Sequence, residues 1–184
     1  MSMATVEFLG DNGLTLVADE WNRDVADPAL PTILLLHGGG QNRLSWKNTG
    51  QVLADSGFHV VALDARGHGD SDRSPDGQYT LPVLVRDAAT VVNQIGRPVA
   101  LIGASMGGMT GILLAQQLGP EVVTKLVLVD VVPRFEHEGT SRIVDFMSRH
   151  VHGFETLEQA ADAIADYLPH RKRPTKLDGL KKNL

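Results

Sequence analysis

The sequence predicts an α/β protein with three α/β/α layers around a mostly parallel sheet, and three observations lead to this prediction. Short apolar runs alternate with longer stretches of helical periodicity, which is typical of repeated strand–helix units. Most of the apolar runs are continuous, as expected for strands that are covered on both faces. The beginning differs, because two strand-like runs flank Asp11-Asn12-Gly13, a sequence that favours an antiparallel hairpin.

The individual elements follow from these runs and from the residues between them. Strands are expected at residues 4–9, 14–21, 31–37, 59–63, 98–102 and 125–132. Helices are expected at residues 46–55, 81–95, 106–119, 143–150, 157–168 and 176–184. In the second helix, apolar residues recur at three- and four-residue spacing, which places them on one face: Leu84, Ala88, Val91 and Ile95.

The chain changes character after Pro133, which ends the last apolar strand. Residues 1–133 contain every expected strand, whereas residues 134–184 contain amphipathic helical stretches with polar links. If the sheet ended at the last of these strands, that strand would be an exposed apolar edge, and such edges invite aggregation. We therefore expect a C-terminal segment or a second polypeptide to complete the fold.

The composition argues against several kinds of partner. The formal net charge is -5 and the pI is about 5.7, which does not suit a nucleic-acid-binding surface and gives no electrostatic reason for membrane binding. There are no cysteines, so disulfides and thiolate metal sites are excluded. The N-terminal residues have neither a basic region nor a long apolar region. We therefore expect a cytoplasmic protein that binds neither nucleic acid nor membranes.

A nucleophile is predicted at Ser105, within Gly103-Ala104-Ser105-Met106-Gly107. In this pattern the chain turns so tightly from a strand into a helix that the central residue is strained, and its neighbours must be small. The segment follows the buried strand at 98–102 and opens a helix, which is the context that the pattern requires. The alternative is a glycine-rich turn with an incidental serine.

A second glycine-rich segment, His37-Gly38-Gly39-Gly40, follows an earlier buried strand. Glycines there allow backbone N–H groups to approach a substrate oxygen. The expected oxyanion donors are the N–H groups of Met106 and Gly39, with Gly40 as the alternative to Gly39. A phosphate-binding loop is disfavoured, because the Gly-Lys-Ser/Thr ending is missing. His37 is expected to have a structural role rather than to act as the base.

Four segments carry a family resemblance, and in chain order they read Leu36-His37-Gly38-Gly39, Asp64-Ala65-Arg66-Gly67-His68-Gly69-Asp70-Ser71, Gly103-Ala104-Ser105-Met106-Gly107-Gly108 and Leu128-Val129-Asp130. In type, order and spacing they resemble the α/β-hydrolase superfamily, over about residues 5–135. They are most similar to its cap-bearing branch of esterases, lactonases, C–C bond hydrolases, cofactor-free haloperoxidases (perhydrolases) and epoxide hydrolases. The resemblance implies an incomplete α/β-hydrolase fold: the first six strands of the core over 1–133 and the start of a helical cap over 134–184.

The resemblance also implies a catalytic serine, acid and histidine in that chain order. Asp130 follows the sixth strand, where some members place the acid, although a structural aspartate is the favoured alternative. The histidines after Ser105 lie in the cap-like region and are not favoured as the base: His137, His150, His152 and His170. This chain is therefore expected to lack the catalytic histidine and acid, and to be inactive alone.

The resulting functional hypothesis is a serine hydrolase that acts on a small carboxylic ester or lactone through an acyl-enzyme on Ser105. A serine, rather than the aspartate of epoxide hydrolases, favours attack on a carbonyl. The alternatives are a C–C bond hydrolase, a perhydrolase, or a ligand receptor without turnover. No cofactor and no metal are expected. The segment from Asp72 to Gly77 resembles the start of a calcium loop, but the twelfth position of that loop would be Val83 instead of the required glutamate. The resemblance implies that Arg66-Gly67-His68-Gly69 is a structural turn.

Several apolar residues of the cap-like region could line a substrate pocket, although a place in the core is the more usual role of such positions in a helix. They are Phe135, Phe146, Met147, Phe154 and Tyr167.

Overall fold

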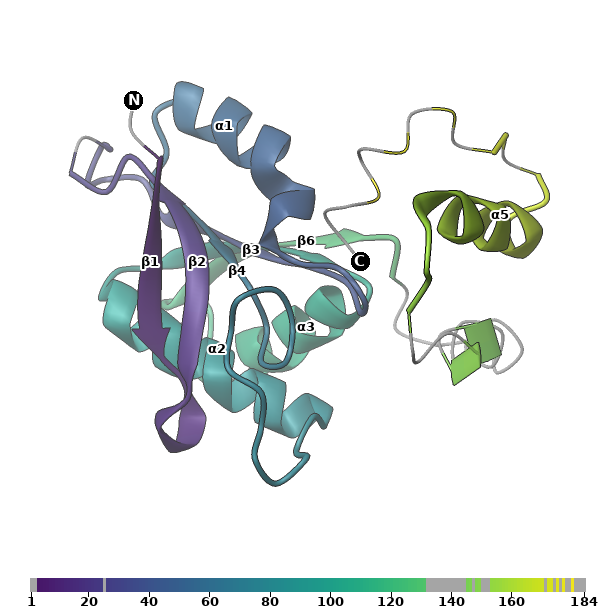
Figure 1. Cartoon of the computed structure of the whole chain (residues 1–184). Helices are drawn as coiled ribbons and strands as arrows, with labels where there is room; N and C mark the ends of the chain where they lie inside the picture. The colour runs from purple at the N-terminus through teal and green to yellow at the C-terminus, as the bar shows by residue number, and fades with distance from the viewer. Residues whose placement is uncertain are drawn as a thin grey trace. The chain divides into compact units, whose positions relative to one another are not determined.

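The computed structural model describes residues 3–24, 26–131, 145–146, 148–149, 153–170, 172–173, 175, 177 and 180. The contacts between residues divide the chain into two compact units, Met1–Val131 and Val132–Leu184. The first unit contains the whole described sheet (Figure 1).

The sheet has six strands in the order β1-β2-β4-β3-β5-β6. Their bounds are Met3–Leu9 (β1), Thr15–Trp21 (β2), Thr32–Leu36 (β3), Val60–Leu63 (β4), Val99–Ala104 (β5) and Val123–Val129 (β6). β1 pairs antiparallel with β2 across a 3₁₀ turn at Asp11–Gly13, and β2 pairs antiparallel with β4. β4, β3, β5 and β6 are all parallel. The predicted combination of an opening hairpin and a parallel sheet is confirmed.

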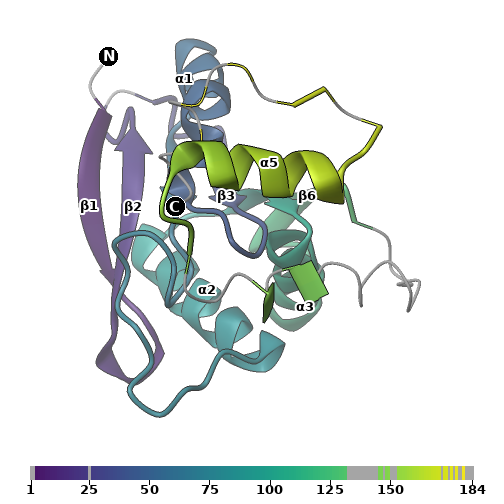
Figure 2. The same cartoon turned by 45° about the vertical axis from the view of Figure 1, so that its right-hand side comes forward.

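Helices cover both faces of the sheet, which confirms the three layers. α1 (Lys47–Asp55) lies on one face, and α2 (Leu81–Ile95) and α3 (Met106–Leu118) lie on the other (Figures 1 and 2). The side chains of β3 explain this arrangement, because they alternate between the two faces. Leu34 and Leu36 pack in the core beneath α2 and α3, whereas Ile33 and Leu35 pack in the core beneath α1.

The ends of two elements differ from the prediction for local reasons. The first helix was expected from residue 46, but a 3₁₀ turn at Arg43–Trp46 precedes α1. The side chain of Asn42 accepts a hydrogen bond from the N–H of Leu44 and so begins this turn.

The last strand was expected to reach residue 132, but β6 ends at Val129. Asp130 has a positive φ of 52°, which ends the extended conformation.

β6 forms one edge of the sheet in the part of the chain that the structure describes. Its last three residues are apolar and exposed: Val127 (49%), Leu128 (37%) and Val129 (39%). By contrast, every residue of β3 and β4 is buried. The exposed apolar edge that the sequence predicts is therefore present at β6.

The second unit contains α5, at Leu157–Tyr167. The side chain of Thr156 caps this helix by accepting a hydrogen bond from the N–H of Gln159, at 3.1 Å. The rings of Phe146 and Tyr167 are in contact, with their centroids 4.6 Å apart.

Parts of the sequence predictions lie outside the described residues. These parts are Phe135, Met147, His137, His150, His152 and most of the helical stretches at 143–150 and 176–184. No helix in the described ranges has the length and the apolar character needed to cross a membrane.

Candidate active site

Ser105 lies at a sharp turn between β5 and α3, as the sequence pattern predicts. Its backbone angles are φ 45° and ψ -111°, outside the regions that residues with a side chain normally occupy. The residue is exposed, although β5 and the start of α3 beside it are largely buried. A hydroxyl on such a turn points away from the packed core and toward solvent or a substrate.

Three glycines allow this turn because backbone packs directly against backbone. A Cβ on Gly103 would overlap the carbonyl of Gly107, and a Cβ on Gly107 would overlap the carbonyl of Leu36. A Cβ on Gly108 would lie 2.6 Å from Cγ1 of Val131. The first turn of α3 is thus wedged against the ends of β3 and β5, and no larger residue fits there.

The backbone of Ser105 is held from both sides. Its N–H donates a hydrogen bond of 3.1 Å to the carbonyl oxygen of Val129, and its own carbonyl oxygen accepts the N–H of Met109 at 3.0 Å. β6 and α3 therefore fix the backbone of Ser105 jointly.

The loop Gly38–Gly40 lies beside Ser105, because a Cβ built on Gly38 would come within 3.5 Å of the Cβ of Ser105. Two of its three N–H groups already have acceptors. The N–H of Gly38 donates to Oε1 of Gln41 at 3.0 Å, and the N–H of Gly40 donates to Nε2 of His68 at 3.4 Å. Among the described residues, none accepts a hydrogen bond from the N–H of Gly39.

Met106 opens α3, so its N–H has no acceptor within the helix. Gly39 and Met106 therefore each have a free N–H group beside Ser105 within the described residues, whereas the N–H of Gly40 has an acceptor.

His37 uses both ring nitrogens to join two loops. Nδ1 donates to the carbonyl oxygen of Gly38 at 2.8 Å, and Nε2 accepts the N–H of Ala65 at 3.0 Å. This pattern requires the neutral ring with its proton on Nδ1. Burial lowers the pKa of His37, and nearby His68 lowers it further, which outweighs the opposing effects of the Gly38 carbonyl and Asp64.

The other described histidines of the first unit are similarly occupied. His68 pairs Nδ1 with the carbonyl oxygen of Arg66 at 3.1 Å and Nε2 with Gly40. His59 bonds to Oγ1 of Thr32 and to Oε1 of Glu20, both at 2.8 Å. Within residues 3–24 and 26–131, no histidine has a ring nitrogen left for Ser105.

The acidic segment after β4 binds an arginine of its own chain. The buried guanidinium of Arg43 contacts Asp19 at 3.0 Å, Asp64 at 2.5 Å and Asp70 at 2.7 Å. Burial alone would lower the pKa of Arg43, but its hydrogen bonds to the three carboxylates raise the pKa above its usual value. Asp19, Asp64 and Asp70 therefore hold Arg43, which anchors the chain just after the glycine loop.

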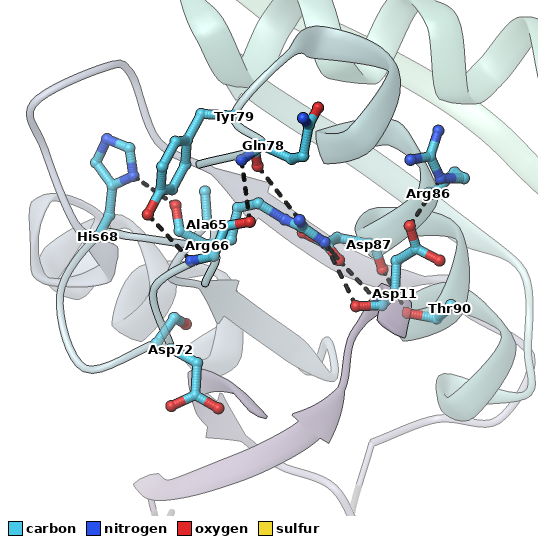
Figure 3. A network of polar contacts seen from close by, with 12 residues as sticks. Asp11, Ala65, Arg66, His68, Asp72, Gln78, Tyr79, Arg86, Asp87 and Thr90 are labelled. Carbon is cyan, nitrogen blue, oxygen red and sulfur yellow. Dashed lines mark hydrogen bonds and ion pairs between the residues drawn. The ribbon is translucent and has the colours of Figure 1, made fainter. Parts of the chain in front are cut away.

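A second buried ion pair anchors the segment that carries His68 (Figure 3). Arg66 binds Asp87 of α2 through two bonds, Nε to Oδ2 at 2.6 Å and Nη2 to Oδ1 at 2.7 Å. The hydrogen bonds that Arg66 donates to Asp87 raise the pKa of Arg66 despite the opposing effect of burial. Sequence reasoning missed this pair, although a signal existed: Asp87 stands beside Ala88 on the apolar face of its helix.

Asp130 lies next to Ser105 in the register of the sheet, since Ala104 and Val129 form the last pair of β5 with β6. It is exposed, and its carboxylate has no hydrogen-bond or ion-pair partner within the described part of the chain. Ser105 and Asp130 are the residues that directly follow these neighbouring strands, and both have a positive φ.

Comparison with known proteins supports this description of the fold. A family model described as the alpha/beta hydrolase fold matches residues 31–174. A structure of an alpha/beta hydrolase from Novosphingobium aromaticivorans aligns with a TM-score of 0.83 and 26% identity, covering 98% of this chain and 63% of that one.

Two curated relatives are similar in sequence. The sn-1-specific diacylglycerol lipase ABHD11 of Mus musculus is 39% identical over 109 residues, which are 58% of this chain and 34% of that protein. Protein phosphatase methylesterase 1 of Mus musculus is 32% identical over 138 residues, which are 72% of this chain and 36% of that protein. The chain thus spans about a third of the length of these relatives. With the match to the family model, these likenesses show that the chain belongs to the α/β-hydrolase fold family.

Proposed function

We propose that the protein is a serine hydrolase that cleaves a small carboxylic ester or lactone through an acyl-enzyme on Ser105. One observation carries the proposal: the exposed, strained Ser105 lies between two free backbone N–H groups. One is the N–H of Gly39 in the neighbouring glycine loop, and the other is the N–H of Met106, the residue that follows Ser105. The names of the relatives, a lipase and a methylesterase, support ester chemistry.

In the proposed reaction, Oγ of Ser105 attacks the ester carbonyl and loses its proton to a base. The carbonyl oxygen becomes an oxyanion, which accepts hydrogen bonds from the N–H groups of Gly39 and Met106. The tetrahedral intermediate collapses, the alcohol leaves with a proton, and water then hydrolyses the acyl-enzyme. Losing one such donor costs about 3 kcal/mol of transition-state stabilisation in comparable sites.

The base is proposed to come from outside the described residues of the first unit, because His37, His59 and His68 use both of their ring nitrogens elsewhere. Asp130 is the candidate acid, on the strength of its position beside Ser105 and its unpaired carboxylate within the described ranges. In this proposal the 184-residue chain is inactive by itself, and a further segment or a second polypeptide supplies the base.

The test is covalent labelling of the complete protein, with the segment or polypeptide that supplies the base present, by a small fluorophosphonate. The product is read by intact mass and by the labelled peptide. Wild type should gain one phosphonyl group on Ser105, and Ser105→Ala should gain none. Ser45→Ala is the matched control, since Ser45 is also exposed and lies outside the turn. Labelling that survives in Ser105→Ala, or that is lost in Ser45→Ala, would overturn the assignment.

Labelling also separates the proposal from a receptor without turnover, because a receptor would bind ligands without phosphonylation of Ser105. Three assays of the complete protein separate the ester hydrolase from a C–C bond hydrolase and a perhydrolase, which would use the same serine. They measure hydrolysis of aryl esters, cleavage of C–C bonds and peroxide-dependent formation of a peracid.

A further inference from the structure

We infer that His68 is a positioning residue, which holds Gly40 so that the N–H of Gly39 is the donor that the loop presents beside Ser105. Its role in catalysis rests on the proposed function, whereas the hydrogen bonds themselves can be tested without any turnover. The inference depends on three features: the proton position on His68, the anchoring of its loop, and the absence of side-chain packing at Gly39. The loop has other restraints at Gly38, whose carbonyl oxygen accepts the N–H of Gln41 at 3.2 Å and Nδ1 of His37 at 2.8 Å.

The partners of His68 determine where its proton lies. A carbonyl oxygen can only accept a hydrogen bond, so Nδ1, 3.1 Å from the carbonyl oxygen of Arg66, carries the hydrogen. The backbone N–H of Gly40 can only donate, so Nε2 presents its lone pair to it at 3.4 Å. One neutral form of the ring satisfies both bonds.

The residue that holds His68 is itself immobilised. Figure 3 shows the side chain of Arg66 reaching from the loop that carries His68 toward Asp87 and Asp11. Besides its paired bonds to Asp87, the guanidinium donates to the carbonyl oxygen of Gln78 at 3.3 Å. A row of contacts thus runs from α2 through Arg66 and His68 to the glycine loop.

The glycine loop needs such a support because it has no Cβ atoms. Gly40 has a φ of 69°, and a Cβ on Gly39 would meet nothing within 4 Å, so packing does not fix the orientation of these peptides. Hydrogen bonds must do so. Gln41 holds Gly38 at one end and His68 holds Gly40 at the other, which leaves only the N–H of Gly39 for a substrate oxygen.

Loss of the acceptor at Nε2 should therefore loosen the Gly39–Gly40 peptides without removing any group that touches the substrate. An oxyanion site works through donors that are already oriented before reaction. The expected result is slower reaction at Ser105 with little change in ligand binding.

Two variants of similar size separate this role from a general structural one. In His68→Gln the amide oxygen can reach the position of Nε2 and accept from Gly40. In His68→Asn the amide reaches only the position of Nδ1, so it can still donate to Arg66 but leaves Gly40 without an acceptor. Equal thermal unfolding midpoints of the two variants would show that any difference between them is local.

The first readout is nuclear magnetic resonance of the full chain, which needs no activity. Wild type should show His68 with its proton on Nδ1. Exchange of the Gly40 amide proton should be faster in His68→Asn by roughly fivefold to tenfold and nearly unchanged in His68→Gln. A proton on Nε2 in wild type, or equal exchange in the two variants, would overturn the inference.

The second readout is the rate of fluorophosphonate labelling of Ser105 in the complete protein, with the segment or polypeptide that supplies the base present. His68→Asn should react about tenfold more slowly at saturating reagent, with an unchanged half-saturating concentration, and His68→Gln should recover most of the rate. If wild type is not labelled at all, the proposed function fails, while the exchange experiment still decides the role of His68. Equal labelling rates in wild type and His68→Asn would contradict the catalytic part of the inference.

Discussion

The backbone N–H of Ser105 donates a hydrogen bond to the carbonyl oxygen of Val129, so Ser105 is bonded to the last residue of β6. The strand that provides this acceptor is the exposed edge of the described sheet. By contrast, α3 and the ends of β3 and β5 surround the turn with close backbone contacts. The position of Ser105 thus depends on α3, β3 and β5, which pack tightly around the turn, and on β6, which forms an edge of the described sheet.

Gly107→Ala should destabilise the protein by at least about 3 kcal/mol, because the new Cβ would overlap the carbonyl of Leu36 and the backbone there has no room to move. The free energy of unfolding in urea measures this. Gly39→Ala is the control, since its Cβ would meet nothing within 4 Å, and it should unfold within about 0.5 kcal/mol of wild type. Similar stabilities for the two variants would show that the turn adapts to a side chain.

Arg66→Lys should cost about 2–4 kcal/mol of folding free energy, since an ammonium group cannot reproduce the two parallel bonds to buried Asp87. Arg86→Lys is the matched control. Arg86 pairs with Asp11 at 2.7 Å, but its side chain is 51% exposed, so the expected change is within about 0.5 kcal/mol. Urea unfolding of both variants decides the matter, and an equally small loss in Arg66→Lys would contradict a structural role for the buried pair.

Stability should fall as the pH drops below 6.5, the ordinary pKa of histidine, because burial lowers the pKa of His37 in the folded state. In the window below 6.5 the unfolded chain binds a proton that folded His37 does not, so acid favours unfolding. One such proton contributes at most about 1.4 kcal/mol per pH unit.

Urea unfolding between pH 7.5 and pH 5.5 should therefore give a smaller slope in His37→Asn than in wild type, whatever the offset in stability at pH 7.5. His170→Asn serves as the control for replacing an exposed histidine. A slope in His37→Asn as steep as in wild type would assign the acid sensitivity to other groups.

The layers, the opening hairpin and the turn at Ser105 could be predicted from the sequence because their signals are local. Continuous apolar runs indicate strands that are covered on both faces, and β3 and β4 are fully buried. The small residues around Ser105 indicate a tight strand-to-helix turn, and its backbone has the expected strain.

The sequence predicts Gly39 as the oxyanion donor but does not show what occupies the N–H of Gly40, because its acceptor is His68, 28 residues further along the chain. The ion-pair partners of Arg43 could not be predicted either, because its three carboxylates come from β2 and from the segment after β4. Spacing in the sequence does not reveal which distant side chain accepts a given N–H. Such pairings depend on how the strands are ordered in the sheet, and that order is not the order of the chain.

The glycine contacts around Ser105 have a consequence for engineering the site. Since main-chain atoms of Gly103, Gly107 and Leu36 pack around the turn, the position of the Ser105 hydroxyl depends mainly on the backbone. A library that randomises the exposed side chains around the turn should therefore leave that hydroxyl in place. The glycines must be kept constant in such a library, because they set the geometry that every new pocket would share.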